Sequence, residues 1–371
     1  MGMSPPWACS TCMDSRRIAI IVSPWFPVPP QGYGGIELMA YNLGRELSSR
    51  GHHVTIIGRQ GSQGPYESLA LAPESWTRQL GTRDELAREN LFLYRAYETV
   101  RRRAFDVIHD NSGMNGILVA AQSRLQAPVV ATLHGALSEA EGDFLNAVDR
   151  QVHLVSISRA QQALVASVEW RGMVHNAINP EEYTPITKPE EKQDYLVELA
   201  RISPEKGQDV AIEIAKRLRM PLVLAGKVDY DARRYFEEKI KPNLDGQVTW
   251  REDVRGKEKA ELLARARAML FPIQWEEPFG IAMVEAMVSG TPVIAMRRGA
   301  APEVVEPGVT GFLAEDLDGM VEAFGRIKEI DLKRCAEVAT GRFGPAQMAD
   351  GYVNVYERAI DDALYTAPPL S

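Results

Sequence analysis

The sequence predicts an α/β protein with two doubly wound, Rossmann-like parallel-sheet domains that face each other across a cleft. The chain has 371 residues, which is more than one hydrophobic core usually supports. Short apolar segments alternate with helical sequence in both halves, a pattern typical of parallel sheets covered by helices. Between the halves, Thr184 to Lys192 is rich in Pro, Thr and charge and is predicted to be the linker.

The predicted strands are short apolar segments that end in polar or glycine-containing loops. In the first half they are Arg17 to Ser23, His53 to Gly58, Tyr66 to Leu71, Phe105 to His109, Val129 to Leu133 and His153 to Ile157. In the second half they are Tyr195 to Leu199, Leu222 to Ala225, Val248 to Trp250, Met269 to Pro272 and Val293 to Met296.

The domain boundaries follow from these segments. Residues 1–15 are predicted to be a disordered leader, or the product of a start codon placed too early, with Met13 as the native start. Residues 16–185 are predicted to form the N-terminal domain and residues 186–344 the C-terminal domain. A final helix at about 345–371 is predicted to return to the first domain and complete it.

Composition narrows the function classes. A net charge of -8 argues against a general nucleic-acid binder. No apolar run approaches the roughly 20 residues that a membrane helix needs, and the N-terminus lacks the apolar core of a signal peptide, so a cytoplasmic protein is expected. Cys9, Cys12 and Cys335 are too few for a disulfide framework, and a lone Cys-x-x-Cys without a second ligand pair is weak evidence for zinc.

The stretch from residue 271 to residue 292 predicts a strand end, a polar loop and a short buried helix. Pro278 suits the first helical position and Gly290 a left-handed cap, which gives a helix of about three turns. That helix is apolar nearly all round except for Glu285. A buried carboxylate either has partners in the protein or binds a ligand, and both readings stay open.

The loop before this helix is a candidate anion site. The free N–H groups of Phe279, Gly280 and Ile281 are expected at the helix N-terminus, and Gly280 allows a phosphate to approach closely. The alternative is that Glu276 and Glu277 merely favour the helix dipole.

Three glycines follow the first strand in the sequence Gly32-Tyr33-Gly34-Gly35. They do not form a dinucleotide fingerprint, which needs GxGxxG directly after the strand. They do allow backbone to approach a ligand at the carboxyl end of the sheet, where open α/β sheets bind ligands. A flexible turn is the alternative.

Two histidines end neighbouring strands, His109 before Asp110-Asn111 and His134 before a glycine. A lone histidine at a strand end is more often structural than functional. In the second half, Arg201 and Lys206 project from one loop at a strand end and suit a diphosphate group. The alternative for these cations is a pair of exposed charges beside Glu205.

The run from Glu277 through Glu285 to Met287, followed by Gly290-Thr291-Pro292, resembles the two-glutamate signature of the retaining family 4 glycosyltransferases of GT-B fold. The loop Pro29-Pro30-Gln31-Gly32-Tyr33-Gly34-Gly35-Ile36 is similar to a branch that includes antibiotic-pathway members. The resemblance covers nearly all of the chain after the leader. It departs from the family at Ala200 and in the hinge residues Ala177 and Asn179.

The resemblance implies a role for each candidate residue. The first domain becomes the acceptor side, and the second becomes the nucleotide-sugar-binding side. Glu277 contacts the donor sugar, Glu285 holds the ribose, and His134 lies beside the sugar. The other implied donor-binding groups are Gly34, Gly35, Arg201, Lys206, Phe279, Gly280 and Ile281, and the implied acceptor-binding residues are Tyr33, Asn111 and His134.

The implied activity is metal-independent transfer of a hexose, with retention, from a nucleotide diphosphate sugar, most often UDP-hexose, to a hydroxyl. The acceptor is a small molecule, a saccharide or a natural product, and a homo-oligomer is compatible with the sequence. The nucleotide sugar is a co-substrate and no bound cofactor is expected. Asp229-Tyr230-Asp231 has the form of a metal motif, but GT-B enzymes generally work without a metal, so none is assigned.

Two rivals stay open. A non-catalytic nucleotide-sugar binding module has the same binding residues but neither transfers nor hydrolyses the donor. An NAD(P)-dependent oxidoreductase shares the alternating fold, but neither half provides GxGxxG with an acidic residue about 20 positions further on.

Overall fold

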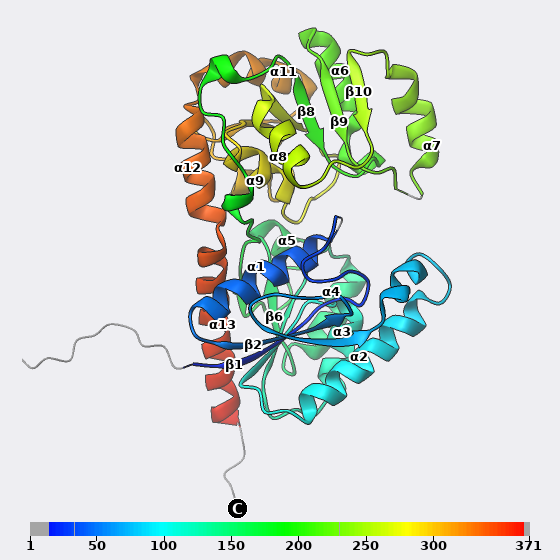
Figure 1. Cartoon of the computed structure of the whole chain (residues 1–371), viewed down its shortest axis with the longest axis vertical. Helices are drawn as coiled ribbons and strands as arrows, with labels where there is room; N and C mark the ends of the chain where they lie inside the picture. Colours follow the sequence, from blue (N-terminus) through cyan, green and yellow to red (C-terminus); the bar gives the residue numbers. More distant parts are fainter. Residues whose placement is uncertain (1–14, 33, 230, 367–371) are drawn as a thin grey trace, which may run out of the picture.

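The computed structural model describes residues 15–32, 34–229 and 231–366, which form two α/β bodies stacked along the long axis of the molecule (Figure 1). Nearly all of the predicted leader with Cys9 and Cys12, the acceptor candidate Tyr33, and Tyr230 of the Asp-Tyr-Asp motif lie outside the described residues. The division into domains at residues 185 and 344 stays a prediction.

The first body contains a seven-stranded sheet in the order β3-β2-β1-β4-β5-β6-β7, with every neighbouring pair parallel. The strands are β1 Arg17–Ile21, β2 His53–Arg59, β3 Glu67–Ala72, β4 Val107–Asp110, β5 Val129–Thr132, β6 His153–Ser156 and β7 Gly172–Met173. The prediction of six strands is confirmed. The sequence did not reveal β7, because two residues at a sheet edge carry no periodic pattern.

The second body contains a six-stranded parallel sheet in the order β10-β9-β8-β11-β12-β13. The strands are β8 Leu196–Leu199, β9 Leu222–Ala225, β10 Val248–Arg251, β11 Ala268–Phe271, β12 Val293–Met296 and β13 Gly311–Ala314. The predicted fold class, two doubly wound parallel sheets, is therefore confirmed. Edge strand β13 was missed because it lies in a segment rich in Gly and Pro.

Helices follow most strands and cover both faces of each sheet (Figure 1). The α-helices are α1 Gly35–Ser49, α2 Glu85–Arg101, α3 Met114–Gln122, α4 Glu139–Val148, α5 Arg159–Leu164, α6 Gln208–Leu218, α7 Arg233–Tyr235, α8 Gly256–Arg265, α9 Ile281–Val288, α10 Ala301–Val304, α11 Leu317–Arg326, α12 Leu332–Phe343 and α13 Pro345–Thr366. Short 3₁₀ turns lie at Glu74–Gln79, Pro180–Glu182, Pro189–Glu191, Pro204–Lys206, Lys241–Asn243 and Ile327–Glu329, and a π turn at Phe236–Ile240. Among the described residues, none of these helices is both long and apolar enough to cross a membrane.

The last helix, α13, returns to the first body and packs against α1, β4 and β5 (Figure 1). The hydroxyl of Tyr356 lies 2.8 Å from His109 Nδ1, and His109 Nε2 lies 2.8 Å from Thr132 Oγ1. Burial lowers the pKa of His109 to about 3, so its ring is neutral at pH 7. His109 is thus structural and ties the end of the chain to the first sheet.

The linker ends at a buried lysine. Lys192 is only 7% exposed, and its Nζ donates hydrogen bonds to Ala264 O at 2.6 Å and Thr291 Oγ1 at 2.7 Å. Burial lowers the pKa of Lys192 from 10.5 to about 7. The linker is therefore held to the second body by a group whose charge changes near neutral pH.

Stability is expected to rise with pH between 7 and 9 because of Lys192. In this window the unfolded chain keeps the Lys192 proton and the folded protein releases it, so the slope approaches about 1 kcal/mol per pH unit. Below pH 7 Lys192 is protonated in both the folded and the unfolded state, so its contribution to stability no longer changes with pH. Above pH 9 the Cys335 thiol, whose pKa burial raises to about 12, acts in the opposite direction.

Urea unfolding at pH 7, 8 and 9 measures this slope. Lys192→Met should flatten it, whereas Lys216→Met, which replaces an exposed lysine of α6, should leave it unchanged. An equal slope in both variants would contradict the assignment to Lys192.

Candidate functional site

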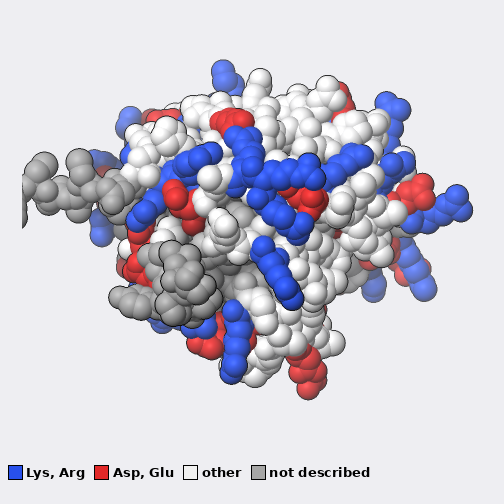
Figure 2. Space-filling view, turned by 90° about the horizontal axis from the view of Figure 1, so that it is seen from below, with Lys and Arg blue, Asp and Glu red and all other residues white. Residues whose placement is uncertain are grey.

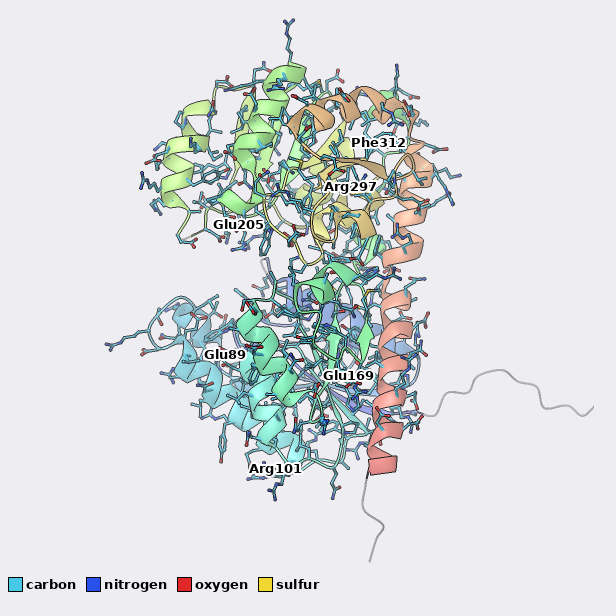
Figure 3. The ribbon with its side chains drawn as sticks, turned by 180° about the vertical axis from the view of Figure 1, so that it is seen from behind. Glu89, Arg101, Glu169, Glu205, Arg297 and Phe312 are labelled. Atoms are coloured by element: carbon cyan, nitrogen blue, oxygen red, sulfur yellow. The ribbon has the colours of Figure 1, made fainter. Side chains whose placement is uncertain are left out.

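The two bodies meet through residues that follow strands at their carboxyl ends. Arg255 of the second body donates from Nη1 to Gln31 O of the loop after β1, at 3.2 Å. A Cβ added at Gly32 would lie 2.7 Å from the Arg255 guanidinium carbon, so a larger residue there would displace the end of the Arg255 side chain. Figure 3 shows Glu205, in the loop after β8, on the side of the second body that faces the first. The loops after β1 and β8 therefore both lie where the two bodies face each other.

The loop after β8 carries the two candidate cations, Arg201 and Lys206. Lys206 Nζ contacts Glu277 Oε2 and lies 4.6 Å from the centroid of the Trp275 ring. The Lys206 and Glu277 side chains are only 11% and 14% exposed. The structure thus joins two residues that the sequence placed 71 positions apart.

Arg201 lies at the other end of the same loop and contacts the Asp229 carboxylate through Nη1. Glu205, the partner that the alternative interpretation required, instead accepts a hydrogen bond from Ser203 Oγ at 2.6 Å. Asp229 belongs to the Asp-Tyr-Asp motif, so one carboxylate of that motif serves an ion pair. In the described part of the chain, no cluster of His, Cys, Asp and Glu is arranged to hold a metal ion.

Glu277 is held in place from several sides. Trp275 Nε1 donates to Glu277 Oε2 at 2.9 Å, and the Ala300 amide donates to Glu277 O at 2.9 Å. Its neighbour Glu276 accepts from the Gly299 amide at 2.7 Å. Both glutamates therefore have specific partners, and the simpler interpretation of two charges near a helix dipole does not describe them.

The helix that follows begins later than the sequence predicted. Gly280 has φ +77 and forms the N-cap, so α9 begins at Ile281, has eight residues and spans about two turns rather than three. The prediction of Pro278 at the first helical position was wrong, because the left-handed conformation of Gly280 interrupts the helix before it. The amide of Phe279 therefore lies outside the N-terminus, which consists of Gly280, Ile281 and Ala282.

The end of α9 is as predicted. Gly290 has φ +74, and its amide donates to Met287 O at 3.0 Å. The Thr291 amide donates to Ala286 O at 2.9 Å, which completes a Schellman cap.

Glu285 is buried in α9 and is paired within the protein. Its Oε1 accepts hydrogen bonds from Tyr183 OH at 2.7 Å and from Lys259 Nζ at 2.6 Å. Burial lowers the pKa of Lys259, but the Glu285 carboxylate outweighs this and leaves the pKa above its ordinary value. The sequence analysis missed both partners because they come from distant segments: Tyr183 directly follows the 3₁₀ turn Pro180–Glu182, and Lys259 lies in α8.

On the first body, two candidates for the acceptor side lie together. His134 Nε2 is 2.9 Å from Asn111 Oδ1, and Asn111 Nδ2 is buried without a hydrogen-bond partner. Burial lowers the pKa of His134 to about 4. The imidazole is therefore neutral at pH 7, with Nε2–H donating to Asn111 and Nδ1 left as an acceptor.

The glycine candidates lie at the N-terminus of α1. Gly34 has φ +148 and forms the N-cap, and Gly35 is the first helical residue. A Cβ added at Gly34 would lie 2.7 Å from Pro30 Cβ and 3.0 Å from Glu37 Oε2. Glu37, which sequence reasoning missed, is buried, and its Oε1 accepts from Ser23 Oγ at 2.5 Å. The sequence signal that could have identified Glu37 is a carboxylate in the first turn of a helix that follows a glycine loop.

This geometry agrees with what comparisons with known families show. Residues 33–182 match Glycosyltransferase Family 4, and residues 180–335 match Glycosyl transferases group 1. Together the two matches span most of the chain. The chain belongs to the family 4 glycosyltransferases.

Relatives of this glycosyltransferase include enzymes that act on different acceptors. It is 27% identical to the MMP alpha-(1->4)-mannosyltransferase of Mycolicibacterium hassiacum over 311 residues, which cover 70% of this chain and 72% of the relative. It is 22% identical to the D-inositol 3-phosphate glycosyltransferase of Mycolicibacterium smegmatis over 408 aligned residues, which cover 94% of this chain and 92% of the relative.

Solved structures share the GT-B fold. AviGT4, a glycosyltransferase involved in Avilamycin A biosynthesis, is 25% identical with a TM-score of 0.73, and the match covers 93% of this chain and 98% of AviGT4. The Anabaena protein Alr3699/HepE, solved with UDP and glucose, is 18% identical with a TM-score of 0.72, and the match covers 92% of this chain and 100% of HepE.

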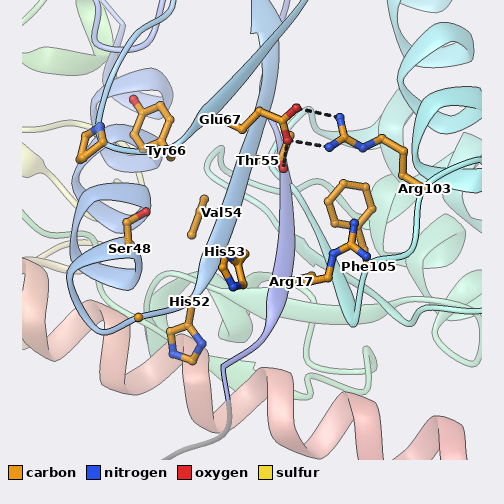
Figure 4. A pocket seen from close by; sticks show the side chains of 12 residues that line it. Arg17, Ser48, His52, His53, Val54, Thr55, Tyr66, Glu67, Arg103 and Phe105 are labelled. Carbon is orange, nitrogen blue, oxygen red and sulfur yellow. Dashed lines mark hydrogen bonds and ion pairs between the residues drawn. The ribbon is translucent and has the colours of Figure 1, made fainter.

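A separate pocket of about 630 Å³ lies at the opposite edge of the first sheet of this glycosyltransferase, where β1, β2 and β3 begin (Figure 4). Two of the residues that line this pocket form an ion pair. Arg103 donates to both carboxylate oxygens of Glu67, at 3.0 and 2.6 Å. Figure 2 shows the molecule from below, where Lys and Arg side chains form a band with Asp and Glu beside them. This pocket is remote from the carboxyl ends of the strands and does not belong to the site described above.

Proposed function

We propose that this glycosyltransferase moves a hexose, with retention of configuration, from a nucleoside diphosphate sugar to an acceptor hydroxyl, with UDP as the nucleotide. The acceptor is a small molecule, a saccharide or a natural product. The observation that carries the proposal is the pair of Lys206 and Glu277 on the Trp275 ring, directly before the N-terminus of α9. This arrangement places a cation, a carboxylate and oriented amides at the carboxyl end of a parallel sheet.

The chemistry requires positive charge where the diphosphate leaves. As the bond between the sugar and the diphosphate breaks, negative charge develops on the leaving oxygen, and fixed cations and amides stabilise it. Lys206, Arg201 and the amides of Gly280, Ile281 and Ala282 supply that charge. With two cations and a helix N-terminus at the diphosphate, the proposed reaction proceeds without a bound metal ion.

The sugar is held by the carboxylate of Glu277. Lys206 and Trp275 both contact Oε2, and Oε1 is the atom that we propose accepts from the hexose hydroxyls. His134 lies on the other side of the sugar as a neutral imidazole. The acceptor oxygen bonds to the anomeric carbon on the face that the diphosphate leaves, and the acceptor proton passes to a phosphate oxygen of the leaving group.

We also propose that Glu285 binds the ribose hydroxyls of the donor. Lys259 and Tyr183 fix its carboxylate through Oε1, so its orientation does not depend on the ligand. UDP is proposed as the nucleotide because HepE, which shares this fold, was solved with UDP.

A thermal-shift panel of UDP, GDP, ADP, dTDP and NADH, with EDTA or with Mg²⁺, tests the donor assignment. A ligand present at about 100 times its dissociation constant stabilises the folded protein by about 2.7 kcal/mol. We expect UDP to give the largest shift, equally in EDTA and in Mg²⁺. Stabilisation by NADH alone would overturn the proposal, and a larger shift with another diphosphate would replace UDP.

A further inference from the structure

Two sets of hydrogen bonds, joined by the backbone of α5, connect the second body to the residues on either side of His134 in the first body. They begin at Glu303 in α10, pass through the N-terminus of α5, and end at the carbonyls on either side of His134. None of these contacts includes a residue of the proposed diphosphate site.

The first link joins the two bodies. The Arg159 amide donates to Glu303 Oε2 at 2.9 Å, and the Ala160 amide donates to Glu303 Oε1 at 2.7 Å. The Glu303 side chain is 19% exposed. Burial raises the pKa of Glu303, but hydrogen bonds from His175 and the two amides outweigh it and leave the pKa below its ordinary value. Glu303 is therefore an ionised carboxylate that caps a helix of the other body.

The N-terminus of α5 is satisfied from two sources. Its own N-cap, Ser158, accepts only the Gln161 amide, at 2.9 Å, through Oγ. The Arg159 and Ala160 amides depend on Glu303. The position of this six-residue helix is therefore set partly by the second body.

The second link is the side chain of Gln161, which is fully buried. Its Nε2 donates to Leu133 O at 2.9 Å and to Gly135 O at 2.7 Å, and its Oε1 accepts from the Ile157 amide at 2.9 Å. Both amide hydrogens are used, so the side chain has one orientation. The two carbonyls belong to the residues directly before and after His134.

We propose that Gln161 and Glu303 are positioning residues that place His134 at the donor sugar when the second body docks on the N-terminus of α5. The inference rests on the proposed function only for the role of His134. The geometric part, that the ring position depends on Gln161 and on Glu303, stands on the hydrogen bonds alone. No local pattern in the sequence indicates this contact, because Glu303 and Arg159 are 144 positions apart.

The test uses Gln161→Leu and Glu303→Gln, with matched controls that change a neighbour on the same helix or immediately after it. Gln162→Leu is the control for the first, since Gln162 is next in α5. Glu306→Gln is the control for the second, since Glu306 follows α10 and its carboxylate lies 3.8 Å from Arg342 Nη1. We expect both test variants to lower kcat for donor turnover about tenfold, with UDP affinity within twofold of the starting protein. Both controls should keep kcat unchanged.

The background His134→Ala separates positioning from general damage. In that background Gln161→Leu and Glu303→Gln should have no further effect on kcat, because residues that act through one group are not additive. An equal tenfold loss with and without His134 would overturn the proposal.

A readout without turnover distinguishes this proposal from the proposed function. The ¹⁵N signals of the His134 ring should move in Gln161→Leu and in Glu303→Gln but not in the two controls. If the protein transfers no sugar and these signals still move, the proposed function fails and the positioning inference stands. If they stay in place, the inference fails. Should Gln161→Leu not fold, Gln161→Glu, which keeps Oε1 and removes the two donors, takes its place.

Discussion

Lys206→Met is expected to lower turnover of the donor about a hundredfold. Lys206 is the less exposed of the two candidate cations, and it is fixed against Glu277 and the Trp275 ring. A preorganised charge at the leaving group contributes roughly 10²- to 10³-fold to rate in comparable sites. Steady-state release of the nucleoside diphosphate, measured at saturating donor, gives the effect on kcat.

Lys227→Met is the matched control, because Lys227 follows the neighbouring strand β9 and is half exposed near Asp253. It should change kcat by less than twofold. Because Lys206→Met leaves the Glu277 carboxylate without its cation, the melting temperature is measured alongside. A folded Lys206→Met variant with full kcat would remove Lys206 from the mechanism.

Glu285→Gln is expected to reduce both stability and nucleotide affinity. The substitution leaves the Lys259 ammonium, whose side chain is 25% exposed, without a carboxylate. Because Lys259 is only partly buried, the cost should fall at or below the lower end of the about 3–5 kcal/mol typical of a fully buried pair. The substitution also removes the carboxylate proposed to accept from the ribose hydroxyls. Urea unfolding and UDP titration measure the two effects separately.

The double variant Glu285→Gln with Lys259→Met distinguishes these effects. Removing both charges should recover most of the stability, because no unpaired charge is then buried. UDP affinity should stay at least tenfold lower, a difference of about 1.4 kcal/mol. If affinity recovers together with stability, Glu285 has only a structural role.

The fold was predictable because its determinants are local. Strands such as β11 and β12 are continuous apolar runs, and the turn after α9 is encoded by Gly290 and Pro292. The start of α9 was not predictable. Pro278 suits a first helical turn, but Gly280 adopts a left-handed conformation that depends on the packing around it. Phe271 and Met283 approach Gly280 so closely that an added Cβ would lie 2.8 and 2.6 Å from their side chains.

The candidate site was predictable where the resemblance supplied a motif. Arg201, Lys206, Glu277 and Glu285 were proposed as site residues in this way, and the structure brings Lys206 and Glu277 into contact. Their partners were not predictable. Lys259 and Tyr183 have ordinary sequence surroundings, and only the packed fold brings them to Glu285.

The surroundings of the two histidines were also not predictable from the local sequence. His109 and His134 both end strands of the first sheet and look alike in sequence. The structure separates them, since His109 is enclosed by Thr132 and Tyr356, whereas His134 is partly exposed beside Asn111. The return of α13, which places Tyr356 against His109, decides the difference, and it is not encoded near the histidines.

The most direct test of the central claim is turnover of nucleotide sugars by the purified protein in EDTA. We predict slow release of UDP from a UDP-hexose in the absence of an acceptor, lost in Lys206→Met. We also predict that NMR will show the released sugar with the anomeric configuration of the donor. Binding of a nucleotide sugar with neither hydrolysis nor transfer would contradict the account and identify the protein as a binding module.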